Sequence, residues 1–128
     1  MSIQEQVFEA VHAMAEALGA YVPLRVGALP EANGLCMAVA AGSIGETTLA
    51  GGESGTLDIV LNGKHENQSA AMGALCAIHE ALRRAAIYPA GERWQVTAIR
   101  TGSVPGYLGR EEKQWLYGSA LKVDYCMQ

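Results

Sequence analysis

The chain has 128 residues, of which 50% are hydrophobic and 17% are charged, and its net charge is −4. This length and apolar content predict one folded domain over residues 1–128 and exclude a largely disordered chain. The acidic balance argues against a nucleic-acid binder that relies on a basic surface. It remains compatible with an acidic passage through which DNA slides without binding.

Signals for export, membrane insertion and disulfide bonding are missing from the sequence. There is no basic stretch followed by an apolar core and a cleavage site, and the apolar runs are far shorter than a membrane span, so we expect neither a signal peptide nor a membrane contact. Three widely spaced cysteines, Cys36, Cys76 and Cys126, form no CxxC pair. Such an odd, scattered set predicts reduced thiols rather than a disulfide or zinc framework.

Two segments have the apolar spacing of amphipathic helices. The first is predicted over residues 3–18, after a Ser-x-x-Glu capping box that begins at Ser2. The second is predicted over residues 68–87, with Asn67 or Ser69 as its N-cap. Each helix should pack one apolar stripe against other elements. The stripes consist of Val7, Val11, Met14 and Leu18 in the first helix, and of Ala71, Leu75, Ile78, Leu82 and Ala85 in the second.

The segment between the helices predicts three strands separated by glycine-bearing turns. An apolar run at residues 35–41 is typical of a buried strand, residues 46–50 form a weaker strand, and residues 56–61 alternate between apolar and mostly polar positions. Turns are expected at residues 42–45 and at residues 51–55, the second as a flexible hairpin tip.

The C-terminal stretch, residues 94–128, holds both tryptophans and predicts two further strands joined by a Gly/Pro-bearing connection at residues 101–113. In the first strand the apolar parity shifts between Val96 and Ile99, which indicates a bulge or partial burial of both faces. The second strand alternates strictly, which is typical of a sheet with one buried face. Its predicted buried side chains are Trp115, Tyr117, Leu121, Val123, Tyr125 and Met127.

The predicted order is helix, three strands, helix, two strands, with a short extended piece at residues 24–26 in the first connection. Short turns between successive strands favour antiparallel pairing. We therefore expect an α+β domain with a mainly antiparallel sheet of about four to five strands and two amphipathic helices packed on one face.

No motif for catalysis, cofactor binding or metal binding emerges from the residues. Residues 51–55 match neither a phosphate-binding loop nor a GxSxG elbow, and the three histidines lack metal-ligand spacing. Cys76 with His79 or His65 is a conceivable nucleophile and base, but a cysteine on an Ala/Leu helix face is typically a small core residue. Residues 64–67, at a strand-to-helix junction, are the best enzymatic candidate, although a solvated helix cap explains them more simply.

Several segments together resemble the small minor capsid proteins of tailed bacteriophages and prophages, which are similar to tail-terminator or tail-completion subunits. The residues that carry this resemblance are 56–65 before an Ala/Leu-rich helix, then 94–96, 100–105 and 114–117. The resemblance covers most of the chain, and its second half is the more persuasive. Its elements are structural landmarks rather than a catalytic signature.

The resemblance implies a structural protein without enzymatic activity, cofactor or metal. Tail terminators form a hexameric ring on the end of the tail tube, stop its polymerisation and help to join the head. The implied partners are further copies of the chain, tail-tube and head-completion proteins, and DNA only as the passing genome; the implied locations are the head–tail junction of the virion and, during assembly, the bacterial cytoplasm. Exposed turns supply the candidate assembly contacts, which are Glu53, Ser54, Tyr107, Arg110, Glu111, Glu112 and Lys113.

Two other functions remain open at this point. A long helix laid on an antiparallel sheet also describes a hot-dog acyl thioesterase, in which His65 and Asn67 would lie near the thioester carbonyl, although the additional N-terminal helix suits this fold less well. The third hypothesis for the function is a small α+β domain that binds a partner.

Overall fold

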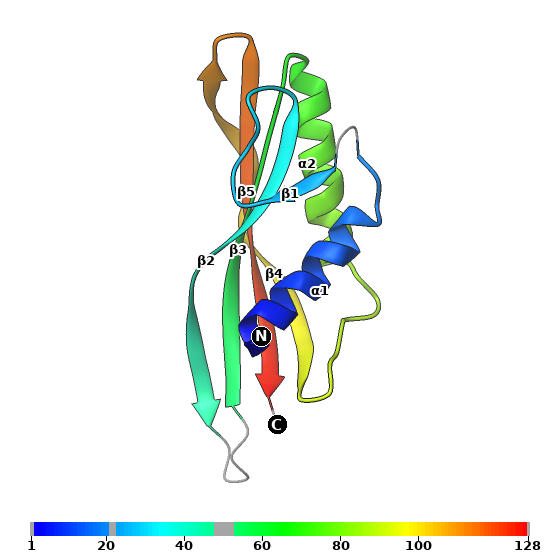
Figure 1. The fold of residues 1–128 in the computed structure, drawn as a ribbon, viewed down its shortest axis with the longest axis vertical. Coiled ribbons are helices and arrows are strands. Elements are labelled where there is room, and N and C mark those ends of the chain that lie inside the picture. The colour runs from blue at the N-terminus through cyan, green and yellow to red at the C-terminus, as the bar shows by residue number, and fades with distance from the viewer. Residues whose placement is uncertain (1, 21–22, 48–52, 128) are drawn as a thin grey trace.

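The computed structural model describes residues 2–20, 23–47 and 53–127, with the side chains of residues 41–47 excepted. It contains one sheet and two helices, and both helices lie on the same side of the sheet (Figure 1). The elements in chain order are α1 (Ile3–Glu16), β1 (Leu24–Val26), β2 (Gly34–Thr47), β3 (Glu53–His65), α2 (Gln68–Arg83), β4 (Trp94–Glu111) and β5 (Gln114–Met127).

The five strands are arranged in the order β1-β2-β3-β5-β4. The short strand β1 pairs in parallel with β2, and every other neighbouring pair is antiparallel. Because α2 lies between β3 and β4 in the sequence, the chain passes over the sheet and returns at its far edge, and β5 then fills the position between β3 and β4. The prediction of an α+β fold with a mainly antiparallel sheet is confirmed.

Helix α1 begins as the capping box predicts. Ser2 Oγ accepts a hydrogen bond from the Glu5 amide at 3.1 Å and donates one to Glu5 Oε1 at 3.1 Å. The helix ends at Glu16, two residues earlier than predicted, before Gly19 adopts a φ of +69°. Leu18 therefore leaves the apolar stripe and is 47% exposed, and the buried face consists of Val7, Val11 and Ala15.

Helix α2 begins with Asn67 as its N-cap, whose side chain accepts from the Ala70 amide at 3.2 Å. It ends at Arg83, four residues before the predicted end at residue 87. The segment that follows lies along the edge of the sheet, where the Val96 amide donates a hydrogen bond to the Pro89 carbonyl at 3.1 Å. The buried face of the helix includes the predicted Ala71, Leu75, Ile78 and Leu82.

The predicted turn at residues 42–45 is wrong, since β2 runs without interruption to Thr47. Its pairing with β3 shifts register between Ala40 and Ser43 and again between Ile44 and Thr47. Bulges of this kind absorb glycines within a strand instead of ending it. Only residues 46–47 of the predicted strand at 46–50 can be compared, since residues 48–50 lie outside the described part.

The strand predicted at residues 56–61 starts earlier than expected. Residues 51–52 lie outside the described part, but Glu53–Gly55 already belong to β3, which continues to His65. Residues 53–55, the described part of the tip predicted at 51–55, are therefore strand.

The predicted connection at residues 101–113 is wrong for most of its length, because β4 extends to Glu111. The strand lies at the edge of the sheet, where a proline that lacks an N–H costs little. Pro105 falls between Ser103 and Gly106, one of four places where the register with β5 shifts. An earlier shift, between Val96 and Ala98, is the bulge that the parity change indicates.

The core lies between the sheet and the helices, and β5 contributes to it as its alternation predicts. Tyr117, Leu121, Val123 and Tyr125 are buried, whereas Trp115 and Met127, near the two ends of the strand, are only partly buried. Facing strands and helices supply the remaining large, fully buried side chains, which include Leu35, Met37, Ile59, Leu61, Leu75, Leu82 and His79.

Gly55 makes room for the ring of Tyr125 on the neighbouring strand. A Cβ at this position would lie 2.7 Å from Tyr125 Oη and 2.8 Å from Cζ. We therefore expect Gly55→Ala to lower the free energy of unfolding by about 1–3 kcal/mol in chemical denaturation, because a packed ring must shift. Gly109→Ala is the matched control, since nothing lies within 4 Å of its Cβ. Equal stability of the two variants would contradict this account of Gly55.

Among the described residues, neither helix has the length and apolar content needed to cross a membrane.

Candidate assembly surface

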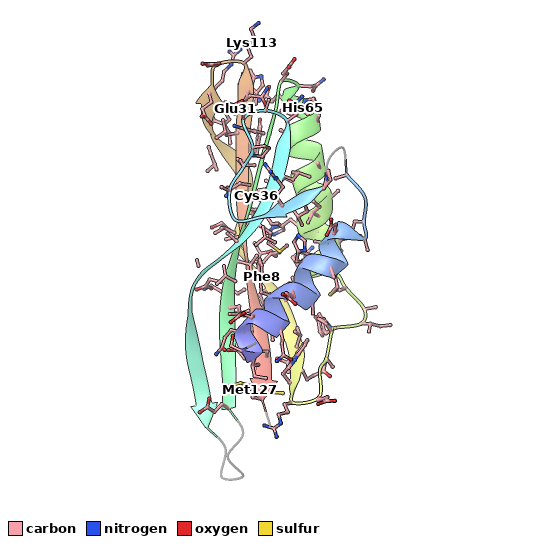
Figure 2. All side chains as sticks on the ribbon, in the orientation of Figure 1. Phe8, Glu31, Cys36, His65, Lys113 and Met127 are labelled. Atoms are coloured by element: carbon pink, nitrogen blue, oxygen red, sulfur yellow. The ribbon has the colours of Figure 1, made fainter. Side chains whose placement is uncertain are left out.

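The structure gathers five of the seven predicted contact residues at one end of the sheet and separates the other two. Tyr107, Arg110, Glu111, Glu112 and Lys113 belong to the hairpin of β4 and β5. Figure 2 shows Lys113 at this end of the molecule and Met127 at the opposite end. Since β3 begins with Glu53 paired to Met127, the remaining candidates Glu53 and Ser54 lie at the far end.

The hairpin turns within two residues, Glu112 and Lys113, between the paired Glu111 and Gln114. Glu112 has a φ of +51°, a left-handed conformation that costs a residue with a Cβ on the order of 1 kcal/mol. Tight turns of this kind hold their flanking strands in a fixed register. The charged side chains of the turn are therefore presented from a defined backbone.

An aromatic cluster supports the hairpin on the side that faces α2. The ring centroid of Tyr107 lies 6.0 Å from that of Trp115 and 5.8 Å from that of Tyr117, in tilted and edge-to-face arrangements that aromatic pairs favour. Tyr117 is buried, and its hydroxyl accepts a hydrogen bond from Gln68 Nε2 at 2.6 Å. The guanidinium of Arg110 stacks 4.7 Å from the centre of the Trp115 ring.

We call Tyr107, Arg110, Glu111, Glu112, Lys113 and Trp115 the tip surface. Tyr107 is 55% exposed although two aromatic rings hold it in place, so it offers a large contact area that loses little conformational freedom on binding. Tyrosine, tryptophan and arginine are the residues most enriched at energetic centres of protein interfaces. The composition and rigidity of the tip surface suit contact with another protein.

A cleft of about 820 Å³ lies beside the tip surface, between the hairpin and the connection that precedes β2. Its lining is rich in charge, and the buried Lys64 contributes from β3, with Nζ 3.8 Å from Glu111 Oε2. Carboxylates outnumber amines, so the lining suits basic groups better than anions. The charged residues are Glu31, Lys64, Glu66, Glu111, Glu112 and Lys113.

Asn33 fixes the wall of this cleft. Its backbone has a φ of +47°, a left-handed conformation that asparagine tolerates better than most residues. Its amide donates to Gln114 Oε1 at 2.8 Å, and its Oδ1 accepts from the Glu66 amide at 3.2 Å. One residue thus connects the loop before β2 to the start of β5 and to the entry of α2.

The polar junction at residues 64–67 forms the N-terminal cap of α2. His65 Nδ1 accepts from the Asn67 amide at 2.9 Å, while the side chain of Asn67 caps the helix. These bonds support the helix-cap interpretation of the junction.

His79 lies in the core. It is fully buried, and its Nδ1 and Nε2 lie 2.9 Å from Ser119 Oγ and 3.1 Å from Thr101 Oγ1. Burial lowers the pKa of this imidazole. The ring connects α2 to β5 and β4, which is a structural role.

Burial raises the pKa of the Cys36 thiol, so at neutral pH it is held in its unreactive form. Within the residues that the structure describes, no three His, Cys, Asp or Glu side chains cluster closely enough to hold a metal ion.

The apolar part of this end of the sheet was not predicted from the sequence. Val104 is 74% and Leu108 is 63% exposed, and both border a shallow hollow of about 360 Å³ on the face away from the helices. Trp115, predicted as a buried side chain, is only partly buried and also supports Arg110. The signal was present in the apolar residues of segment 101–113, but their arrangement becomes visible only once the segment is recognised as strand.

The same outer face carries ion pairs farther along the strands. Arg100 donates to Asp124 Oδ2 at 2.6 Å and to Oδ1 at 2.8 Å, and Thr56 donates to the same carboxylate at 2.7 Å. The hydrogen bond from Arg100 is the main reason why the pKa of Asp124 is lowered. Lys122 bonds to Asp58 at 2.8 Å. These polar groups separate the apolar hollow from the opposite end of the sheet.

Comparison with known proteins adds no assignment: neither a protein-family model nor a curated protein matches the chain.

Proposed function

We propose that this protein is a structural subunit of a tailed bacteriophage or prophage that assembles as a ring on the end of the tail tube, stops its growth and helps to join the tail to the head. The observation that carries the proposal is the tip surface, a rigid hairpin end that combines exposed Tyr107 with Arg110 stacked on Trp115. Such a surface is suited to a specific protein contact. The proposal also draws on the resemblance to phage minor capsid and tail-terminator proteins.

The tip surface is the contact with the tail tube in this proposal. Its hairpin is held by the aromatic cluster and by the bond from Gln68 to Tyr117, so little ordering is needed when a partner binds. The acidic chain, with a net charge of −4, suits a ring that repels DNA phosphates and lets the genome pass. The partners are therefore further copies of the chain, the tube, a head-completion protein and the passing DNA, at the head–tail junction of the virion.

The proposal is tested with tail tubes polymerised from the tail-tube protein of the same genome. Gold-labelled protein should bind to one end of each tube in electron micrographs, and its addition should stop elongation. Label spread along the tubes, or tubes that elongate unchanged beside unbound protein, would contradict the proposal.

A double variant, Tyr107→Ala with Arg110→Ala, should weaken binding to tube ends by at least about tenfold, because it removes the aromatic and cationic centre of the tip surface. Binding is measured by co-sedimentation with preformed tubes. Leu18→Ala is the control, since Leu18 is 47% exposed at the end of α1 and outside the tip surface. Equal binding by the double variant and the control would exclude the tip surface as the contact.

A further inference from the structure

Strand β2 has a free edge along most of its length. Strand β1 pairs with β2 only from Leu35 to Met37, and the Gly27 amide then bonds to the Met37 carbonyl at 2.9 Å. From Ala38 to Thr47 no strand in the described part of the chain lies on that side of β2, as its lower half in Figure 1 shows.

The backbone of Val39 faces this free edge. The N–H and C=O groups of a residue in a strand point to one side, and those of alternate residues point to the same side. Because the Met37 carbonyl points toward β1, the backbone groups of Val39 point in the same direction, away from β3. The side chain of Val39 is 47% exposed.

This edge has only part of the usual protection against pairing with another chain, namely the two bulges in its pairing with β3. Native sheets protect free edges with prolines, charged side chains, bulges or a covering segment. Residues 38–45 contain neither a charged residue nor a proline. An edge that is uncharged from residue 38 to residue 45 is suited to strand addition.

The opposite edge of the sheet, formed by β4, is divided into a covered part and an open part. Residues 89–91 cover its start, where the Val96 amide donates to Pro89 and the Gly91 amide donates to Trp94. From Ala98 to Glu111, β4 has β5 as its only strand neighbour among the described residues. This open part carries the exposed side chains of Val104 and Leu108.

We propose that the chain assembles head to tail, with the free edge of β2 at residues 38–47 pairing with the open part of β4 in a second copy. The two edges belong to one sheet and lie on opposite sides of it, so each copy offers one edge of each kind. Contact between two different surfaces leaves an unused edge at each end of a dimer, and its repetition generates a ring when the rotation between copies closes. This inference rests on the proposed ring and names the contact that forms it.

Two single variants block the two edges separately. Val39→Lys and Val104→Lys each place a lysine at an exposed edge position, which is how native sheets prevent edge pairing. Each variant alone should be monomeric at concentrations at which the wild type assembles. An equimolar mixture should form a heterodimer and nothing larger, because only one intact β2 edge and one intact β4 edge remain. Ile87→Lys, at a loop position that is 83% exposed, should assemble like the wild type.

Native mass spectrometry distinguishes the outcomes. Monomeric variants that combine as a heterodimer support head-to-tail pairing, and their recombination shows that both are folded. Rings that persist in both variants overturn the edge contact but leave the proposed function intact. Assembly that is lost in Val39→Lys but unchanged in Val104→Lys overturns the role of β4. A wild type that never forms more than a dimer overturns the ring and, with it, this contact.

Discussion

Replacing Leu121 with alanine is expected to lower the free energy of unfolding by about 3–4 kcal/mol, a large part of the stability of a domain of this size. Leu121 is fully buried at the centre of β5, the strand that pairs with both β3 and β4. It lies opposite Ile59 on one side and Thr101 on the other. A cavity here removes contacts from three strands and from the helix layer above them, and these surroundings leave little room to collapse.

The measurement is urea denaturation followed by circular dichroism. Val104→Ala is the control, because Val104 is 74% exposed on β4 and its truncation should change the stability by less than about 0.5 kcal/mol. A loss below about 1 kcal/mol for Leu121→Ala would mean that β5 is not the centre of the core.

Replacing His79 with leucine is expected to cost about 2–4 kcal/mol although the new side chain is apolar. The substitution leaves the hydroxyls of Ser119 and Thr101 without their imidazole partner. A buried polar group that loses its partner costs about 1–3 kcal/mol. The triple variant His79→Leu, Ser119→Ala, Thr101→Val removes the hydroxyls as well and should recover part of the loss. No recovery would show that the volume of the site, rather than its hydrogen bonds, sets the cost.

The same histidine should make stability depend on pH. Burial lowers the pKa of His79 in the folded protein below its ordinary value of 6.5, so the unfolded chain binds a proton first as the pH falls. The stability that neutral His79 contributes is fully present above about pH 6.5. It is lost progressively as the pH falls from there to the pKa of His79 in the folded protein. Wild-type protein should therefore lose more stability between about pH 7.5 and 5.5 than His79→Leu does. Equal losses would exclude His79 as the titrating group.

Local patterns in the sequence were sufficient to predict the helix and the strand that bury one regular face. The cap at Asn67 and the stripe from Ala71 to Leu82 correctly predict α2, and strict alternation correctly predicts the buried face of β5. Both elements pack a single face against the core, so their apolar residues recur at the period of a helix or of a strand.

The length of β4 was not predictable from the same patterns. Glycine and Pro105 are typical of a loop, and only the position of β4 at the edge of the sheet makes them compatible with a strand. That position depends on how α2 carries the chain over the sheet, which is a property of the whole fold.

The candidate contact residues were predictable only in part, for a similar reason. Turn residues Glu112 and Lys113 are recognisable locally, whereas the distance of Glu53 from them depends on the antiparallel register of β3 and β5. The support that Trp115 gives to Arg110 also depends on register, because the two residues face each other across the hairpin.

The most direct test of the account is the mass of the wild-type assembly, measured by native mass spectrometry over a range of protein concentrations. The proposed ring predicts a closed oligomer of more than two copies, at least at high concentration, whose images in negative stain show a ring. A dimer or tetramer that hydrolyses acyl-CoA would contradict it and would favour a hot-dog thioesterase, and a monomer at every concentration would favour a small partner-binding domain.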